Sequence, residues 1–110
     1  MIDTIVGSQV PDGLLENYFR SLVNSFFKIL PIRESEEPSL SVYMESLQLE
    51  LIGCKNFICG LDEDSSMLSL ISILQYLIDN PDCPVSTVKR EVFKAINICN
   101  KMKDRYTKAV

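Results

Sequence analysis

The four cysteines are the side chains best suited to act as nucleophiles or metal ligands, because the chain contains no histidine. Without an imidazole, Ser–His and Cys–His nucleophilic pairs and histidine-ligated metal sites are excluded. Cys54, Cys59, Cys83 and Cys99 form no CxxC pair, which disfavours a four-thiolate zinc site. We expect buried, reduced thiols, because a chain that can build a core needs no disulfide. A disulfide or redox role is the alternative.

Two acidic clusters have oxygen ligands of the kind that Ca²⁺ and Mg²⁺ prefer. They are Glu34, Glu36 and Glu37, and Asp62, Glu63 and Asp64. Neither follows the EF-hand spacing, and both fall where polar loops or helix caps are expected. The chain also lacks the glycine-rich phosphate motifs and the GxSxG motif. The sequence therefore predicts no metal, no cofactor and no catalytic activity.

Basic residues are concentrated near the C-terminus of a chain whose net charge is −4. Residues 89–110 hold seven Lys or Arg and two acidic residues, whereas residues 1–88 hold four basic and thirteen acidic ones. The candidate interaction residues on this segment are Lys89, Arg90, Lys94, Lys101, Lys103 and Arg105. They suit an acidic protein surface or nucleic-acid phosphates, and a simply solvated helix face is the plainer interpretation. Nucleic acid is less favoured, because we expect no exposed aromatic side chains between the basic ones.

Residues 13–30 are apolar on two adjacent helical faces. One row is Leu15, Phe19, Leu22, Phe26 and Ile29, and the second is Tyr18, Val23, Phe27 and Leu30. A surface helix needs only one such stripe. We therefore predict that part of this face, with Tyr18, Phe19, Phe26 and Phe27, packs on another copy as a homodimer. The alternative is that the whole face belongs to the core of a monomer.

Hydrophobic periodicity predicts four helices and no strand. The first runs over 13–30, with Asp12 as its N-cap and Pro31 ending it. The second runs over 38–59, between Pro38 and Gly60. The third, over 66–79, is capped from the acidic turn and is apolar nearly all round, so it is expected at the centre of the bundle. The last runs to about Tyr106 and is capped by Ser86 or Thr87.

These elements predict an all-α fold, a small antiparallel helical bundle of about four helices. Residues 1–110 are expected to form a single domain with an N-terminal arm over 1–12. Residues 68–96 could form a helix-turn-helix, but the turn is longer than usual and no recognition helix follows, so a plain helical hairpin is favoured. No leader segment and no membrane span are expected, which favours a cytoplasmic location and suits a small bacterial or phage protein.

The sequence thus favours a non-enzymatic protein–protein interaction module, such as an adaptor, subunit or inhibitor, that self-associates through its apolar first helix. The alternative is a nucleic-acid-binding accessory or regulatory protein that uses the basic last helix. A third class, a protein that binds a small ligand between its helices, stays open, because the sequence does not reveal a cavity.

Overall fold

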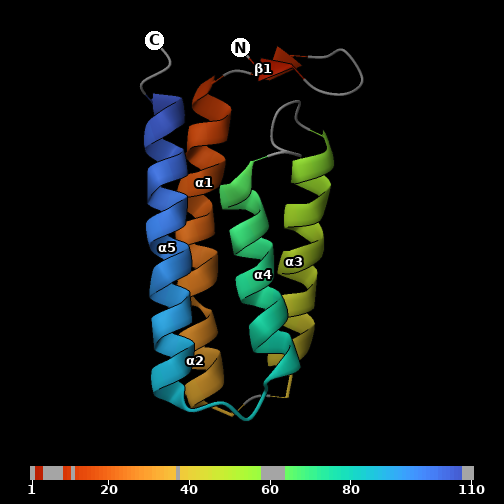
Figure 1. Ribbon diagram of the computed structural model, residues 1–110, viewed down its shortest axis with the longest axis vertical. Coiled ribbons are helices and arrows are strands. Elements are labelled where there is room, and N and C mark those ends of the chain that lie inside the picture. The colour runs from red at the N-terminus through yellow and green to blue at the C-terminus, as the bar shows by residue number, and fades with distance from the viewer. Residues whose placement is uncertain (1, 4–8, 11, 37, 58–63, 108–110) are drawn as a thin grey trace.

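The computed structural model describes residues 2–3, 9–10, 12–36, 38–57 and 64–107. Two short strands, β1 (Ile2–Asp3) and β2 (Gln9–Val10), precede the helices. The helices are α1 (Asp12–Phe27), α2 (Ile29–Glu34), α3 (Leu40–Phe57), α4 (Ser65–Asp79) and α5 (Val85–Thr107). The chain runs down through α1 and α2, up through α3, down through α4 and up through α5 (Figure 1). The predicted all-α antiparallel bundle is confirmed.

The four arms of the bundle differ in how closely they approach each other. α5 lies along α1 over most of its length (Figure 1), while α4 contacts both α3 and α5. α1 and α3 come less close than these pairs. One link between them is a hydrogen bond that the Tyr43 hydroxyl donates to the Ser25 carbonyl oxygen over 2.7 Å. The prediction of a plain hairpin over residues 68–96 is also confirmed, because α4 and α5 lie side by side and antiparallel.

The N-terminal arm contains a strand pair that the periodicity did not predict. Ile2 pairs with Val10 and Asp3 with Gln9 in antiparallel register. Each strand is only two residues long, which is too short to show the alternation by which a strand is recognised in sequence. The prediction that the chain has no strand is therefore wrong for this arm.

The first helix does not end at Pro31, as predicted, but breaks at Lys28 and continues as α2 to Glu34. A proline lacks the N–H that a helix interior needs, yet it is tolerated in a first turn, where that N–H would have no partner. Starting α2 at Ile29 puts Pro31 in such a turn. Glu36 then closes the segment with a φ of 55°, a left-handed conformation that residues other than glycine seldom adopt.

The remaining helix ends shift by one or two residues for local reasons. α3 begins after Ser39, whose carbonyl oxygen accepts a hydrogen bond from the Tyr43 N–H, so Pro38 lies outside the helix. α5 begins after Pro84, whose carbonyl oxygen accepts from Thr87. The prediction that Ser86 or Thr87 caps this helix is wrong, because both lie in its first turn. Gly60, the predicted end of the second helix, lies outside the described residues.

The core is built from one apolar stripe of each long helix. The stripe predicted for the first helix is buried throughout. The other long helices contribute buried residues as well, among them Leu51 of α3, Leu74 of α4 and Val92 of α5. α4, however, is not surrounded: Leu68 and Tyr76 are exposed, as are several of its polar residues. The prediction that this helix occupies the centre is therefore wrong. In a four-arm bundle every arm keeps one side toward solvent, so the apolar residues on that side of α4 stay uncovered by this chain.

Candidate functional site

The aromatic residues predicted to form one interaction face on the first helix divide into two groups. Phe19 and Phe26 are fully buried in the chain's own core. Their role is to fill the interior where α1 meets the other arms, so the prediction that they contact a partner is wrong. Phe27 is 42% exposed and Tyr18 is half-buried. Only these two of the predicted four retain accessible surface.

Tyr18 lies on the side of α1 that faces α3. Its ring contacts that of Phe19 edge-on, with the centroids 5.6 Å apart. Its hydroxyl is buried and makes no hydrogen bond to any described residue. Burial is the largest cause that raises the pKa of Tyr18 above its usual range, and the nearby Cys54 thiol and Glu50 carboxylate raise it further. The hydroxyl therefore stays protonated and is not a base or a nucleophile near neutral pH.

Phe27 is joined on the surface by Phe93 of α5, a residue that sequence reasoning did not select. The two rings meet edge-on, with centroids 5.8 Å apart and planes at 83°. Phe93 is 47% exposed. We call these two rings the aromatic patch. Phe93 could have been found from the helical spacing, because it lies three residues after Arg90 and next to Lys94, on the outer side of α5.

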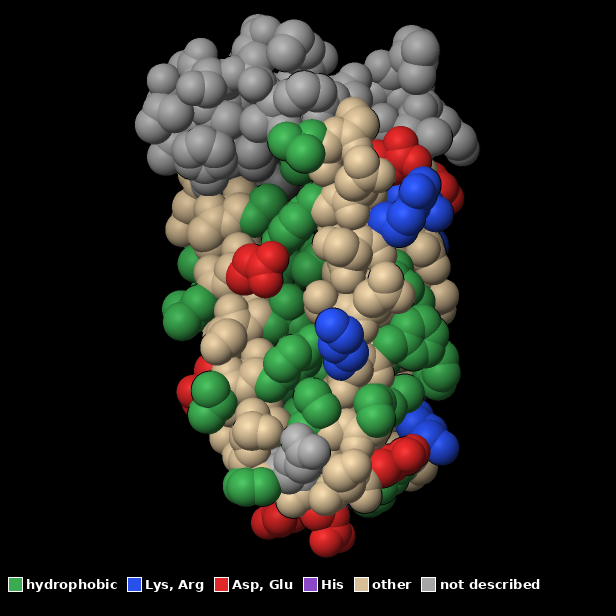
Figure 2. Space-filling view, turned by 180° about the vertical axis from the view of Figure 1, so that it is seen from behind, with side chains coloured by type: hydrophobic (Ala, Val, Ile, Leu, Met, Phe, Trp, Pro, Cys, Tyr) green, Lys and Arg blue, Asp and Glu red, His purple; other side chains and the backbone are tan. Residues whose placement is uncertain are grey.

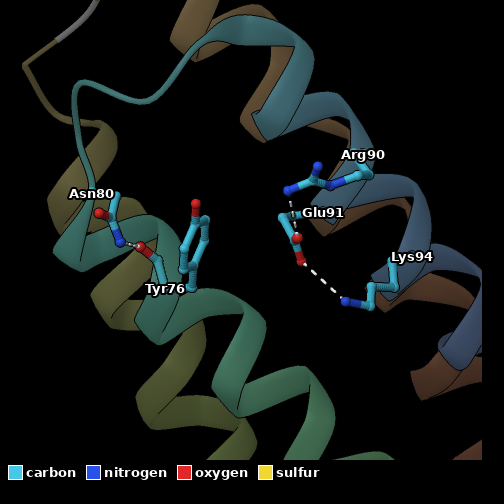
Figure 3. Close-up of polar contacts among 5 residues, drawn as sticks. All are labelled: Tyr76, Asn80, Arg90, Glu91 and Lys94. Carbon is cyan, nitrogen blue, oxygen red and sulfur yellow. Dashed lines mark hydrogen bonds and ion pairs between the residues drawn. The ribbon is translucent and has the colours of Figure 1, made fainter.

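An exposed aromatic therefore does lie among the basic residues of the last helix, contrary to the prediction. Lys89, Arg90 and Lys94 are all exposed around Phe93. Arg90 and Lys94 both approach the carboxylate of Glu91, at 3.5 and 3.6 Å. Figure 3 shows the two cations on either side of Glu91, with Tyr76 of α4 across from them.

Glu91 is the one charged residue buried among those that the structure describes, with only 8% of its surface exposed. A buried carboxylate is costly unless cations pair with it. Arg90 and Lys94 supply those charges from its own helix, and both side chains remain more than half exposed. The basic residues next to the aromatic patch are thus solvent-exposed cations, two of which pair with Glu91.

The other predicted basic residues do not gather at one place. Arg105, near the far end of α5, donates hydrogen bonds to the Asp64 carboxylate over 3.2 Å and to the Ser66 hydroxyl over 3.0 Å. Asp64 also caps α4 by accepting a hydrogen bond from the Ser66 N–H over 2.8 Å, as the acidic turn predicted. Arg105 therefore ties α5 to α4. Lys101 is exposed and Lys103 is half-buried.

The face of the bundle formed by α1 and α3 carries a band of hydrophobic side chains between more polar margins (Figure 2). Among the residues that link the two helices there, Tyr18, Tyr43 and Cys54 are half-buried. This chain thus covers much of their surface itself. The rings of Phe27 and Phe93, at the junction of α1 and α5, are more exposed.

The described cysteines are free thiols, in agreement with the prediction. Cys99 is fully buried, and burial raises its pKa to about 12. Cys54 and Cys83 are half-buried rather than buried, and burial raises the pKa of Cys54 as well. Cys59 lies outside the described residues. A protonated thiol is a weak nucleophile, so neither Cys54 nor Cys99 is set up for covalent chemistry.

The part of the chain that the structure describes contains neither a cluster of three or more potential metal ligands nor a helix that could cross a membrane. No group of three or more Cys, Asp or Glu side chains there is arranged to hold a metal ion. Of the predicted acidic clusters, Glu34 and Glu36 are exposed, and Glu37, Asp62 and Glu63 lie outside the described ranges. None of the helices in the described part of the chain combines the length and apolar character required to cross a bilayer.

The arrangement that stands out among the described residues is therefore the aromatic patch with the exposed basic residues of α5 around it. Comparisons of the chain with protein-family models, with curated proteins and with solved structures find no match.

Proposed function

We propose that the protein is a non-enzymatic protein–protein interaction module, an adaptor, subunit or inhibitor, whose contact surface is centred on the aromatic patch. The observation that carries this proposal is the pairing of Phe27 with Phe93 at the surface, where both rings stay nearly half exposed. Aromatic side chains, phenylalanine included, and arginine are enriched at protein interfaces. Here Arg90 stands beside the rings.

The exposed parts of the two rings are sufficient to contribute to binding. A phenylalanine offers about 150–250 Å² of surface. At about 25 cal/mol per Å², covering the exposed half of each ring is worth roughly 2 kcal/mol. Phe27 and Phe93 already contact each other, so their side chains lose little conformational freedom when a partner binds. The entropic cost of the contact is therefore lower.

The occupant that we propose is a second copy of the chain, in a contact between unlike faces. The outer side of α3 exposes Val42 at 62% and Leu49 at 69%, two turns apart. Glu45 is exposed between them on the same side. An apolar face with an acidic centre complements an aromatic patch bordered by cations. If the aromatic patches of two copies docked on each other, the cations of one copy would face those of the other, which is unfavourable.

This contact modifies the predicted homodimer. The first helix contributes Phe27, but α5 supplies the second ring and the charges. An interface between two different faces forms a ring or an open chain of copies unless its rotation closes, whereas a two-fold dimer uses the same face twice. Self-association is therefore expected to continue beyond two copies as the concentration rises.

Sedimentation velocity over a range of micromolar concentrations tests this proposal. We expect a mass that rises with concentration above the 12.5 kDa of one chain. Phe93→Ser should hold the protein at one chain. Leu14→Ser is the matched control, because Leu14 is also an exposed apolar residue of α1 but lies about 20 Å from Phe27 along the helix, at 1.5 Å per residue. A wild-type chain that stays at 12.5 kDa throughout, or equal effects of the two variants, contradicts the proposal.

The absence of catalysis and a cytoplasmic location are parts of the same proposal. The chain has no histidine, and the raised pKa values of Cys54 and Cys99 leave those thiols protonated near neutral pH. Free, partly accessible thiols at Cys54 and Cys83 suit a reducing compartment.

Nucleic-acid binding is the second candidate, because Phe93 could stack on a base beside Lys89 and Lys94. Against it, Glu91 places a carboxylate next to both Arg90 and Lys94, and Arg105 is engaged with α4. Retention on a DNA or heparin column, lost in a Lys94→Glu, Lys101→Glu variant, would support this candidate. No retention at about 50 mM salt would exclude it, since phosphate contacts strengthen as salt falls.

A further inference from the structure

The long helices of the bundle form two antiparallel pairs. α1 packs chiefly on α5, and α3 packs chiefly on α4, whereas each contact between the two pairs is less extensive. The α3–α4 hairpin joins the rest of the chain through two connections, one from α2 and one to α5. Both connections lie at the end of the bundle away from β1 (Figure 1). The hairpin is therefore attached to the rest of the chain at one end only.

The connection between α2 and α3 is short and contains a strained residue. Five residues separate Glu34, the end of α2, from Leu40, the start of α3. Among them, Glu36 has a φ of 55°, a conformation that costs free energy in residues that carry a Cβ. The closed chain thus retains strain at Glu36 that an extended connection would release.

The connection between α4 and α5 is equally short and contains two prolines. Five residues separate Asp79 from Val85, and Pro81 and Pro84 are among them. A proline biases the residue before it toward extended backbone. Five extended residues span up to about 17 Å, which exceeds the spacing of about 8–10 Å between the axes of packed helices. Either connection, when extended, is therefore long enough to carry the hairpin to an adjacent copy.

Polar contacts and a shared core hold the hairpin against α1 and α5. Tyr43 of α3 donates its hydrogen bond to the Ser25 carbonyl oxygen of α1, and Arg105 of α5 donates to Asp64 at the end of α4 opposite the connections. Apolar residues of both helix pairs belong to one core. Because exposing that core to water is costly, a hairpin that leaves it must be replaced by an identical surface. Only another copy of the chain supplies that surface.

We propose that two copies of the chain exchange their α3–α4 hairpins and form a domain-swapped dimer, in which each hairpin packs on α1 and α5 of the other copy. The contacts that hold the hairpin in one closed chain are then remade between copies. The balance between closed chain and dimer therefore depends mainly on the connections and on the entropy lost on association. Short connections under strain favour such an exchange. In the dimer, the strain at Glu36 is released at two positions.

The exchange goes beyond the proposed function and does not depend on it. Phe27 of α1 and Phe93 of α5 both belong to the pair that is not exchanged, so the dimer carries two aromatic patches. Exchange requires the core to open, so the dimer forms slowly and persists after dilution. A contact between folded surfaces at the aromatic patch instead reverses on dilution. All the experiments below use chains that carry Phe93→Ser, which removes the patch and separates the two kinds of association.

Refolding from urea at two concentrations tests the exchange. We expect single chains after refolding at about 5 µM and a dimer after refolding at about 500 µM. The dimer should survive dilution to about 5 µM for hours, as measured by size-exclusion chromatography. Protein refolded at the low concentration starts as single chains, and the sedimentation comparison of Phe93→Ser with the wild-type chain uses such protein.

Substitutions at Glu36 test the role of the strained connection. Glu36→Gly should raise the refolding concentration needed for half-maximal dimer at least about tenfold, because it relieves the strain of the closed chain. Glu36→Ala is the matched control, since it removes the same charge but keeps the Cβ. It should leave this concentration nearly unchanged.

Refolding two charge variants together identifies the exchanged segment. Asp64→Arg places two cations at the bridge between α4 and α5, and Arg105→Asp places two carboxylates there. Like charges then meet in each single chain and in each dimer of identical copies. A swapped dimer of one variant with the other brings opposite charges together at both bridges. We therefore expect this mixed dimer to exceed the half share that random pairing gives.

Glu16→Arg refolded with Arg20→Glu is the matched control, because it makes the same changes of charge at a bridge within α1. Hairpin exchange leaves that bridge within one chain, so its mixed dimer should stay at the half share. The proposal would be overturned if no dimer outlasted dilution, or if Glu36→Gly and Glu36→Ala behaved alike. It would also be overturned if the Asp64 and Arg105 variants gave no more mixed dimer than this control.

Discussion

The ring of Phe93 on α5 meets the ring of Phe27 on α1 edge-on at the surface, with 5.8 Å between their centroids, and neither ring enters the core. The preceding residue, Phe26, lies about 100° around the helix from Phe27 and is completely buried. Adjacent phenylalanines on one helix thus serve different purposes. Phe26 stabilises the fold, whereas Phe27 forms part of a surface on which we expect a second copy to dock.

Replacing Phe26 by alanine should lower the free energy of unfolding by about 3–5 kcal/mol, the usual cost of deleting a buried aromatic ring. That is a large share of the 5–15 kcal/mol typical of a domain. Urea denaturation followed by circular dichroism measures the change. A loss under about 1 kcal/mol would mean that Phe26 is not in the interior.

Replacing Phe93 by alanine should cost only about 1 kcal/mol, because the ring is half exposed and loses chiefly its edge-on contact with Phe27. The same denaturation experiment, run at a concentration where the chain is monomeric, gives the value. If Phe93→Ala destabilises the fold as strongly as Phe26→Ala, the ring is a core residue and the aromatic patch is misassigned.

Replacing Asp64 by alanine should cost about 0.5–2 kcal/mol, since it removes the N-cap of α4. The bridge to Arg105 should add less than about 1 kcal/mol, because the arginine is about half exposed. A double-mutant cycle with Arg105→Met separates these two contributions. A coupling energy larger than the capping effect would show that the link between α4 and α5 dominates.

Stability should fall as the solution becomes alkaline. Burial raises the pKa of the Cys99 thiol from 9.0 to about 12, so the folded chain keeps its proton where the unfolded chain has released it. The unfolded chain then binds fewer protons than the folded one, and the free energy of unfolding decreases as pH rises from about 9 toward 12. The raised pKa values of Cys54 and Tyr18 act in the same direction.

The contribution of Cys99 is measured by comparison with Cys99→Ala. The stability advantage of the wild-type chain over this variant should shrink between about pH 7 and about pH 10.5. Titration of the surface lysines is common to both proteins and cancels in the difference. An advantage that stays constant over this range would contradict the raised pKa of Cys99.

Much of the fold follows from helical periodicity. The row Leu15, Phe19, Leu22, Phe26 and Ile29 repeats at three and four residues, and the structure buries every member of it. Burial of such an apolar stripe is the dominant favourable contribution to folding, which is why the spacing in the sequence predicts the buried face of the helix. The acidic turn likewise predicted the cap that Asp64 provides.

What the sequence did not show depends on contacts between distant segments. The second apolar row of the first helix suggested a wide interface, but Tyr18, Val23 and Leu30 pack partly against the chain's own core. Phe93 became part of the candidate site only because α5 lies beside α1. The helix breaks at Lys28, and this break places Pro31 in the first turn of α2. Local helix propensity alone does not predict where such a break falls.

A charge-reversal cycle between Lys89 and Glu45, followed by sedimentation velocity, tests the proposed contact most directly. Lys89 is exposed one turn before Phe93, and replacing it leaves the two cations that pair with Glu91 in place. Lys89→Glu alone should leave the chain at 12.5 kDa, because it sets a carboxylate against Glu45 of the next copy, and Glu45→Lys alone should do the same. Both substitutions together should restore association, since they exchange the charges across the contact without changing their complementarity. If the double variant stays at 12.5 kDa while the wild-type chain associates, Lys89 and Glu45 do not meet and the proposed contact is wrong.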